Sequence, residues 1–223
     1  MATFPPWARR ETPDPTRQDE AGCGRYEDIE VTYPHKPSIE AAVRQVIVAI
    51  GEDPDREGLA QTPRRIAEMY ADVFSGLRED PLALLSVGFD SAEHHEMVIL
   101  KGIPFYSMCE HHFLPFGGVV HVGYIPNGRI VGISKIARAA DALARRPQVQ
   151  ERMTSQLADL LMEGLKADGA GVVVEATHLC MTMRGVKKEG STIVTSAMRG
   201  VFRHDPRTRI EFLALIGRAH HDW

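Results

Sequence analysis

The chain has 223 residues, a formal net charge of −4, an apolar fraction of 43% and three cysteines. This length can bury a substantial core, and the charge balance excludes the basic surface of a general nucleic-acid-binding protein. No apolar run approaches the roughly 20 residues that a membrane-spanning helix needs, and so few cysteines argue against a disulfide framework and favour a reducing cytoplasm.

Residues 1–37 differ in composition from the rest of the chain. They hold six of the 14 prolines, many charges and few aliphatic side chains. Arg9 and Arg10 are not followed by an apolar segment, so the sequence predicts no secretion signal. We expect this stretch to be a disordered or loosely docked arm.

Two helices are predicted after the arm. The first has apolar residues at helical spacing, begins with Ser38 as its N-cap and ends at Gly51. The second begins with Thr62 as its N-cap, has Pro63 at its first helical position and ends at Gly76.

The hydrophobic pattern then changes, which separates a helical region, 38–80, from a sheet-containing region, 81–223. Strands are predicted at 96–109, leading into a cluster of polar residues, and later at 169–185 and 191–202. A Pro-Asn-Gly turn at 126–128 predicts a hairpin of two short strands within 118–133.

The helices of the second region come in a block. Ser134 is predicted to cap a helix that reaches about Arg146, and Pro147 separates it from a helix over about 148–166. A last helix is predicted at 208–217. Because strands and helices do not alternate regularly, we predict an α+β fold with an antiparallel sheet.

The sequence Cys-Glu-His-His at 109–112 predicts a metal site. Cys109 and His112 are three residues apart and can point at one ion from a turn. Side chains of the predicted strand 169–185 alternate between its faces, and one face carries His178, Cys180 and Arg184. Cys180 can therefore complete a Cys₂His set, and three protein ligands with one open position are typical of a catalytic zinc.

Other readings of these residues remain open. His111, His178 or Cys23 could be a fourth ligand, which would make the site a closed, structural one. The cysteines could also be buried apolar residues. If His111 and His178 are not ligands, they are suited to proton transfer near neutral pH.

Basic residues near the same segments suggest an anion site. Ser134 lies at a predicted helix N-terminus, and Lys135 and Arg138 share one face of that helix. Together with Arg184, Lys187 and Lys188 they could hold a polyphosphate. The alternatives are a solvated basic surface and a simple helix cap.

Gln150 and Glu151 open the helix that follows Pro147. The Glu151 carboxylate could accept two hydrogen bonds from a guanine edge, whereas adenine would present an acceptor there. The alternative is a favourable first-turn charge.

These stretches together resemble GTP cyclohydrolase I of the zinc-dependent type. The matching segments span roughly residues 38–217 and read "TPRRIAEMY", "FSGL", "CEHHFLPFGG", "GYIPNGRIVGISKIAR", "RPQVQERMTSQ", "HLCMTMRGV" and "TSAMRGVF". The resemblance implies hydrolysis of the imidazole ring of GTP at C8, release of formate, and ribose opening and rearrangement to 7,8-dihydroneopterin triphosphate. That reaction is the entry step to folate and pterin biosynthesis.

The resemblance also implies a role for each matching residue. The zinc ligands, one ion per subunit, would be Cys109, His112 and Cys180; the catalytic residues His111, His178 and Ser134; and the GTP contacts Glu151, Gln150, Lys135, Arg138, Arg184 and Arg65. Arg65 would reach the triphosphate across a subunit boundary, although Arg64 is adjacent.

The implied architecture is the tunnelling fold, an antiparallel sheet with helices on one side. Five subunits would join their sheets into a barrel, and two pentamers would form a decamer with active sites between subunits. Two alternatives differ in function: another tunnelling-fold enzyme, such as a pterin synthase or nitrile reductase, and a zinc-stabilised binding module without activity.

Overall fold

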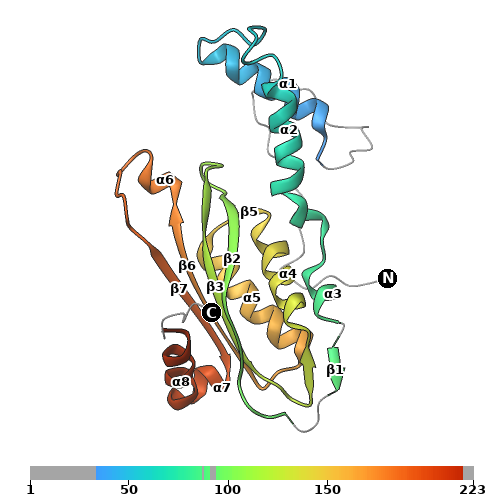
Figure 1. Ribbon diagram of the computed structural model, residues 1–223, viewed down its shortest axis with the longest axis vertical. Coiled ribbons are helices and arrows are strands. Elements are labelled where there is room, and N and C mark those ends of the chain that lie inside the picture. The colour runs from blue at the N-terminus through green and yellow to red at the C-terminus, as the bar shows by residue number, and fades with distance from the viewer. Residues whose placement is uncertain (1–33, 87, 91–93, 218–223) are drawn as a thin grey trace, which may run out of the picture. The chain divides into compact units, whose positions relative to one another are not determined.

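The computed structural model describes residues 34–86, 88–90 and 94–217 (Figure 1). Most of the predicted arm, including Cys23, lies outside the described residues. The last two residues of that stretch, Lys36 and Pro37, already belong to a helix.

Helices follow one another up to residue 85, as the sequence predicts. They are α1 (Lys36–Ala49), α2 (Thr62–Val73), a 3₁₀ turn (Ser75–Arg78) and α3 (Pro81–Leu85). Among the described residues, no helix is both long and apolar enough to cross a membrane.

The helix starts differ from the predicted caps. His35 is the N-cap of α1, and its Nδ1 lies 2.7 Å from the Ser38 hydroxyl, so Ser38 lies inside the first turn. Gln61, not Thr62, is the N-cap of α2. Both helices have a proline at the first or second helical position, where its fixed φ suits a helix and its missing N–H is not needed. The prolines, rather than the hydroxyl side chains, mark these starts.

A five-stranded sheet forms the centre of the fold, in the order β5-β2-β3-β6-β7. Its strands are β2 (Val98–Cys109), β3 (Pro115–Ile125), β5 (Pro147–Gln148), β6 (Gly169–His178) and β7 (Ile193–Gly200). All neighbours are antiparallel except the short β5, which runs parallel to the end of β2. The predicted α+β class with a mainly antiparallel sheet is confirmed.

The predicted hairpin within 118–133 is wrong. The chain turns at 126–128, where Gly128 has a φ of +71°, but β4 (Arg129–Val131) pairs with β1 (Gly88–Asp90) in a separate two-stranded sheet. A turn signal specifies that the chain changes direction. It does not specify which strand the outgoing segment pairs with.

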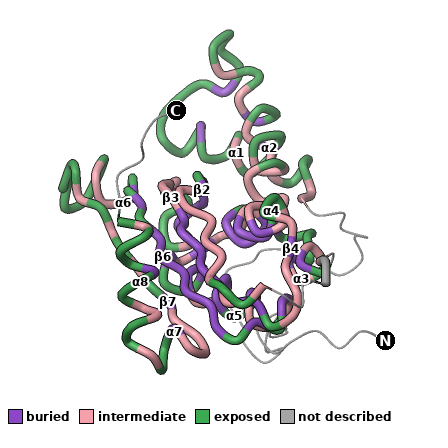
Figure 2. The backbone as a smooth tube through the Cα atoms, turned by 60° about the horizontal axis from the view of Figure 1, so that its bottom comes forward, coloured by how far each residue is buried: buried purple, intermediate pink, exposed green. Residues whose placement is uncertain are grey.

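Two long helices, α4 (Ile133–Ala144) and α5 (Gln150–Leu165), cover one face of the sheet (Figure 1). Their inward faces are fully buried and include Ile136, Leu143 and Leu161. Figure 2 shows buried residues along these two helices and the central strands. The main core therefore lies between this helical layer and the sheet.

The opposite face is covered at one end by α7 (Val201–His204) and α8 (Pro206–Gly217). Phe202 and Phe212 pack there against Val173. A Cβ at Gly123 would lie 2.7 Å from the Phe212 ring, and one at Gly171 would lie equally close to Phe202. Glycine is needed at both positions because the aromatic rings lie directly on the strands. The rest of this face, towards the ends of β2 and β6 that carry the site, has no such cover among the described elements.

Candidate metal and substrate site

The structure brings Cys109, His112 and Cys180 together. One possible ligand atom from each lies within 4.8 Å of the other two, and the group could hold a metal ion. The Cys109 Sγ is 3.8 Å from the His112 Nδ1 and 4.0 Å from the His111 Nδ1. His111 is nevertheless outside the three-residue group. The predicted Cys₂His set is thus assembled, with His111 beside it.

The loop between β2 and β3 positions the first two predicted ligands, Cys109 and His112. Cys109 ends β2 and is buried, and its N–H donates to the Leu114 carbonyl at 2.9 Å. The N–H groups of His112 and Phe113 both donate to the Cys109 carbonyl. These bonds close a tight loop, so that Cys109 and His112 are presented from one rigid turn while the histidines stay exposed.

Phe113 anchors this loop, a role that the sequence did not reveal. Its φ is +51°, in the left-handed region that non-glycine residues seldom adopt. Its ring packs edge-on against Phe74 at 5.5 Å and lies 6.4 Å from the Tyr70 ring. These aromatic contacts offset the backbone strain and tie the metal loop to α2.

Cys180, the third predicted ligand, does not lie on a strand, contrary to the prediction. β6 ends at His178, and the chain continues as one helical turn, α6 (Leu179–Thr182), that carries Cys180. Arg184 follows this turn, so Cys180 and Arg184 do not continue the strand face of His178. Burial and the neighbouring Cys109 raise the pKa of the Cys180 thiol, and Arg184 opposes this shift.

His178 is held at the end of β6. Its ring is buried, stacks on Phe116 with centroids 4.3 Å apart and planes 9° apart, and its Nε2 lies 2.8 Å from the Gln150 Oε1. Burial lowers the pKa of His178, while the negative charge of Glu151 opposes the shift. A lowered pKa favours the neutral form of the imidazole, which can accept a proton.

The predicted anion site lies at the start of α4, but Ser134 is not its cap. Gly132 is the N-cap, and the helix has no side-chain cap. The Ser134 hydroxyl is therefore exposed in the first turn, followed by Lys135 and Arg138 on the same helix. Within the described ranges, neither basic side chain forms a salt bridge. Their charges are thus not neutralised by a protein carboxylate.

Arg64 and Arg65 are distinguished by their contacts. Arg64 donates to the Gln61 Oε1 at 3.2 Å and pairs with Glu68 at 3.3 Å. Arg65 is exposed and, in the part of the chain that the structure describes, forms no salt bridge. This difference favours Arg65 as the residue available to a ligand.

An ion pair that the sequence did not reveal connects the metal loop to α5. Glu110 pairs with Arg152, whose Nε also donates to the Gln148 Oε1 at 2.8 Å. Glu151, the predicted guanine contact, is exposed in the first turn of α5, next to this pair. Glu110 and Arg152 lie on two different segments, and the sequence near either residue does not indicate that they pair.

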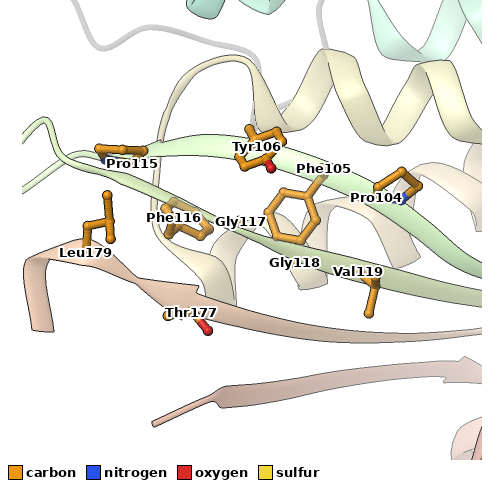
Figure 3. A pocket seen from close by; sticks show the side chains of 10 residues that line it. All are labelled: Pro104, Phe105, Tyr106, Pro115, Phe116, Gly117, Gly118, Val119, Thr177 and Leu179. Carbon is orange, nitrogen blue, oxygen red and sulfur yellow. The ribbon is translucent and has the colours of Figure 1, made fainter. Parts of the chain in front are cut away.

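A shallow hollow of about 420 Å³ lies over the uncovered part of the sheet (Figure 3). Its lining is mainly apolar and includes Phe116, Gly117 and the 81% exposed ring of Tyr106. A Cβ at Gly117 would lie 2.7 Å from that ring. The hollow lacks the cations that a triphosphate needs.

The α+β fold thus carries a Cys₂His group that could hold a metal ion, with His111 beside it. Comparison with known families gives a match to GTP cyclohydrolase I over residues 39–217. The chain belongs to the GTP cyclohydrolase I family.

The chain is similar to curated relatives along most of their length. It is 61% identical over 181 residues to the GTP cyclohydrolase 1 of Dehalococcoides mccartyi strain CBDB1, covering 80% of this chain and 95% of the relative. It is 59% identical over 179 residues to that of Geobacillus kaustophilus, with the same coverage. A crystal structure of an archaeosine synthase QueF-Like in the apo form has 20% identity and a TM-score of 0.38, over 47% of this chain and 93% of that one.

Proposed function

We propose that this chain hydrolyses the imidazole ring of GTP, releases C8 as formate and forms 7,8-dihydroneopterin triphosphate. The observation that carries this proposal is the grouping of Cys109, His112 and Cys180 beside two histidines that are not part of the group, in a chain of the GTP cyclohydrolase I family. Three ligands leave one coordination position for chemistry.

We infer that the metal is zinc, one ion per subunit. Two thiolates and one imidazole are a donor set that zinc prefers. Zinc bonds of about 2.0–2.3 Å would set tetrahedral donors about 3.3–3.8 Å apart, close to the 3.8 Å between the Cys109 Sγ and the His112 Nδ1. Zinc bound there would supply Lewis-acid activation of water at neutral pH.

His111 and His178 would move protons at the purine ring and the opening ribose. His178 is buried and held in one orientation, which suits a proton acceptor. His111 is exposed and lies close to Cys109, where a substrate could reach it. Ser134, exposed and without a capping bond, would act near the ribose.

The remaining contacts would orient GTP. Glu151 would accept hydrogen bonds from the N1–H and 2-amino groups of guanine, which adenine cannot offer. The triphosphate would be held by four cations, namely Lys135, Arg138, Arg184 and Arg65. The first two lie at the start of α4, where helix N–H groups add favourable charge.

We propose that the subunits assemble through their sheets, as two stacked pentamers. β7 pairs only with β6, and β2 pairs with β5 only at Met108 and Cys109, so both edges of the described sheet are largely unpaired. Unpaired edges favour strand addition. Tyr106 at 81% and Val194 at 59% exposure leave apolar surface for a neighbour to cover. Arg65 would then reach a neighbouring subunit's site, and the enzyme would work in the cytoplasm at the start of folate and pterin synthesis.

The test is a formate assay on zinc-loaded protein with GTP, with ATP as the matched control nucleotide. We expect formate from GTP only, abolished by a chelator and restored by zinc. Tightly bound zinc without formate would contradict the proposal and indicate a structural metal site.

A further inference from the structure

The side chain of Gln150 is enclosed by protein. It is 1% exposed, at the start of α5. Its Nε2 lies 3.1 Å from the Val174 carbonyl oxygen, 3.0 Å from the Ile193 carbonyl oxygen and 3.1 Å from the Thr195 hydroxyl. Its Oε1 lies 2.8 Å from the Nε2 of His178. The two amide hydrogens are thus shared among three protein acceptors, and none is left for a guanine edge.

These contacts fix which end of the amide faces which partner. The carbonyl oxygens of Val174 and Ile193 can only accept hydrogen bonds, so the atom facing them must be the amide nitrogen. The amide oxygen therefore faces His178. Because that oxygen can only accept, the Nε2 of His178 must carry a hydrogen.

The hydroxyl groups of Thr154 and Thr195 require the same orientation of the Gln150 amide. The Thr154 hydroxyl donates to the backbone carbonyl oxygen of Gln150 at 2.7 Å. Its single hydrogen is then used, so the Thr195 hydroxyl, 2.7 Å away, must donate to the Thr154 oxygen. The Thr195 oxygen is left to accept from the Gln150 amide. Each hydrogen-bond donor in this buried network therefore has one acceptor geometry that fits. Rotating the Gln150 amide by 180° would place its oxygen against the carbonyl oxygens of Val174 and Ile193, which are also acceptors.

The other ring nitrogen of His178 remains available. Stacking on Phe116 sets the plane of the imidazole. No hydrogen bond to the Nδ1 of His178 is formed by residues 34–86, 88–90 or 94–217. With a hydrogen fixed at Nε2, the neutral ring has its lone pair at Nδ1.

We propose that Gln150 is a positioning residue that holds His178 in the tautomer protonated at Nε2, which makes Nδ1 the atom that accepts and returns a proton during turnover. This role rests on the proposed function of His178 and replaces the substrate contact that the family resemblance implied for the Gln150 side chain. The guanine edge is left to Glu151.

The tautomer can be measured directly by ¹⁵N solid-state NMR on sedimented, zinc-loaded protein with ring-labelled histidine. The His178 signals are assigned by their loss in His178→Asn. We expect a hydrogen on Nε2 and none on Nδ1 in the unsubstituted protein without substrate. A hydrogen on Nδ1 would overturn the proposal, whatever happens to any variant.

Gln150→Met keeps the length of the side chain and removes its strong acceptor. We expect a second His178 signal, with hydrogen on Nδ1. The kcat for formate release should fall by about tenfold or more, because this tautomer has no lone pair at Nδ1 to accept the proton. The KM for GTP should stay within about twofold, since no interaction with bound substrate is removed. An unchanged tautomer would contradict the positioning role.

Thr195→Val is the matched control. It removes a hydrogen bond from the same buried network but leaves both carbonyl partners of the amide and its oxygen in place. We expect the Nε2-protonated tautomer and most of the kcat to be retained. Equal losses in both variants would show a general packing effect and overturn the proposal. Absence of formate from the unsubstituted protein would instead contradict the proposed function, while the tautomer measurement would still stand.

Discussion

A ligand atom of Cys109 and one of Cys180 lie within 4.8 Å of each other, although one residue ends a strand and the other lies on a helical turn beyond a different strand. The intervening strand β3 pairs with both β2 and β6 and sets this distance. Cys109 and Cys180 are thus brought together by the order of the strands in the sheet.

The Cys₂His assignment predicts that two neighbouring residues respond differently to substitution. Cys180→Ala should lose zinc, because a ligand is removed. His178→Ala should keep zinc at about one ion per chain and lose about 10²–10⁴ in kcat, as expected for a general acid–base group. Zinc content after gel filtration checks the first property and formate release the second. Equal zinc loss in both variants would make His178 a ligand and the site a closed one.

Glu151→Gln is predicted to impair GTP binding without affecting zinc. The amide offers a donor where two acceptors are needed, so the KM for GTP should rise about 10- to 100-fold, as for a lost hydrogen bond to a charged group. Glu163→Gln, on the same helix α5, is the control and should leave the KM unchanged. Unaltered binding by Glu151→Gln would leave Glu151 as a first-turn charge.

Arg65 and Arg64 provide a paired test of the triphosphate site. Arg65→Ala should raise the KM for GTP by about tenfold or more, since a charged hydrogen-bond donor is lost. Arg64→Ala breaks the exposed pair with Glu68 and the hydrogen bond to Gln61, and it should change the KM less than about twofold. Steady-state kinetics on both variants decide between the two positions, and a reversed order would reject Arg65.

The left-handed backbone at Phe113 predicts an unusual order of stability. Phe113→Ala and Phe113→Gly both lose the ring contacts to Tyr70 and Phe74, each pair worth about 0.5–1.5 kcal/mol. Only glycine also removes the backbone strain, about 1–2 kcal/mol. The glycine variant should therefore unfold at a higher urea concentration than the alanine variant. An alanine variant at least as stable would show that the loop relaxes when the ring is absent.

Asp141 predicts a pH dependence of stability. Burial raises the pKa of its carboxyl group, Glu79 adds to the shift, and Arg145 opposes it. The native protein then holds a proton that the unfolded chain, with a pKa of 3.8, has released. The contribution of Asp141 to stability is thus greatest below pH 3.8 and falls as the pH rises through the native pKa.

Asp141→Asn removes this ionisation. The variant should have a higher urea midpoint than the unsubstituted protein at pH 7, and the difference should shrink towards pH 4. The same gain at both pH values would show that the effect does not come from titration of the carboxyl group.

The sequence was sufficient for residues whose role depends on their own chemistry. Cys109, His112 and Cys180 could be grouped because few residue types bind zinc, and α4 and α5 could be predicted as separate helices because Pro147 interrupts the helical stretch. Prediction failed where the outcome depends on a distant partner. Nothing near residues 129–131 indicates pairing with β1, and nothing near Gln150 indicates that its amide is enclosed by β6 and β7.

Local rules also failed at the ends of elements. The alternating pattern of β6 continues past His178 in the sequence, whereas the chain turns into α6 there. The hydroxyl residues Ser38, Thr62 and Ser134 were assigned as caps from residue type, yet each lies within the first helical turn. A side chain one to three residues from a helix start fits several registers, so residue type alone does not select the boundary.

A metal ion bound by both Cys109 and Cys180 would act as a reversible cross-link across the sheet. It closes a long chain segment that contains β3, α4, α5 and β6, and so restricts the unfolded chain more than any contact within one turn. Removal of the ion would therefore weaken the whole unit and not only its ligand loop. Chelation of the ion should therefore also affect the packing of α5 on the sheet. Amide hydrogen exchange in α5 should become faster, together with exchange in the strands that it covers.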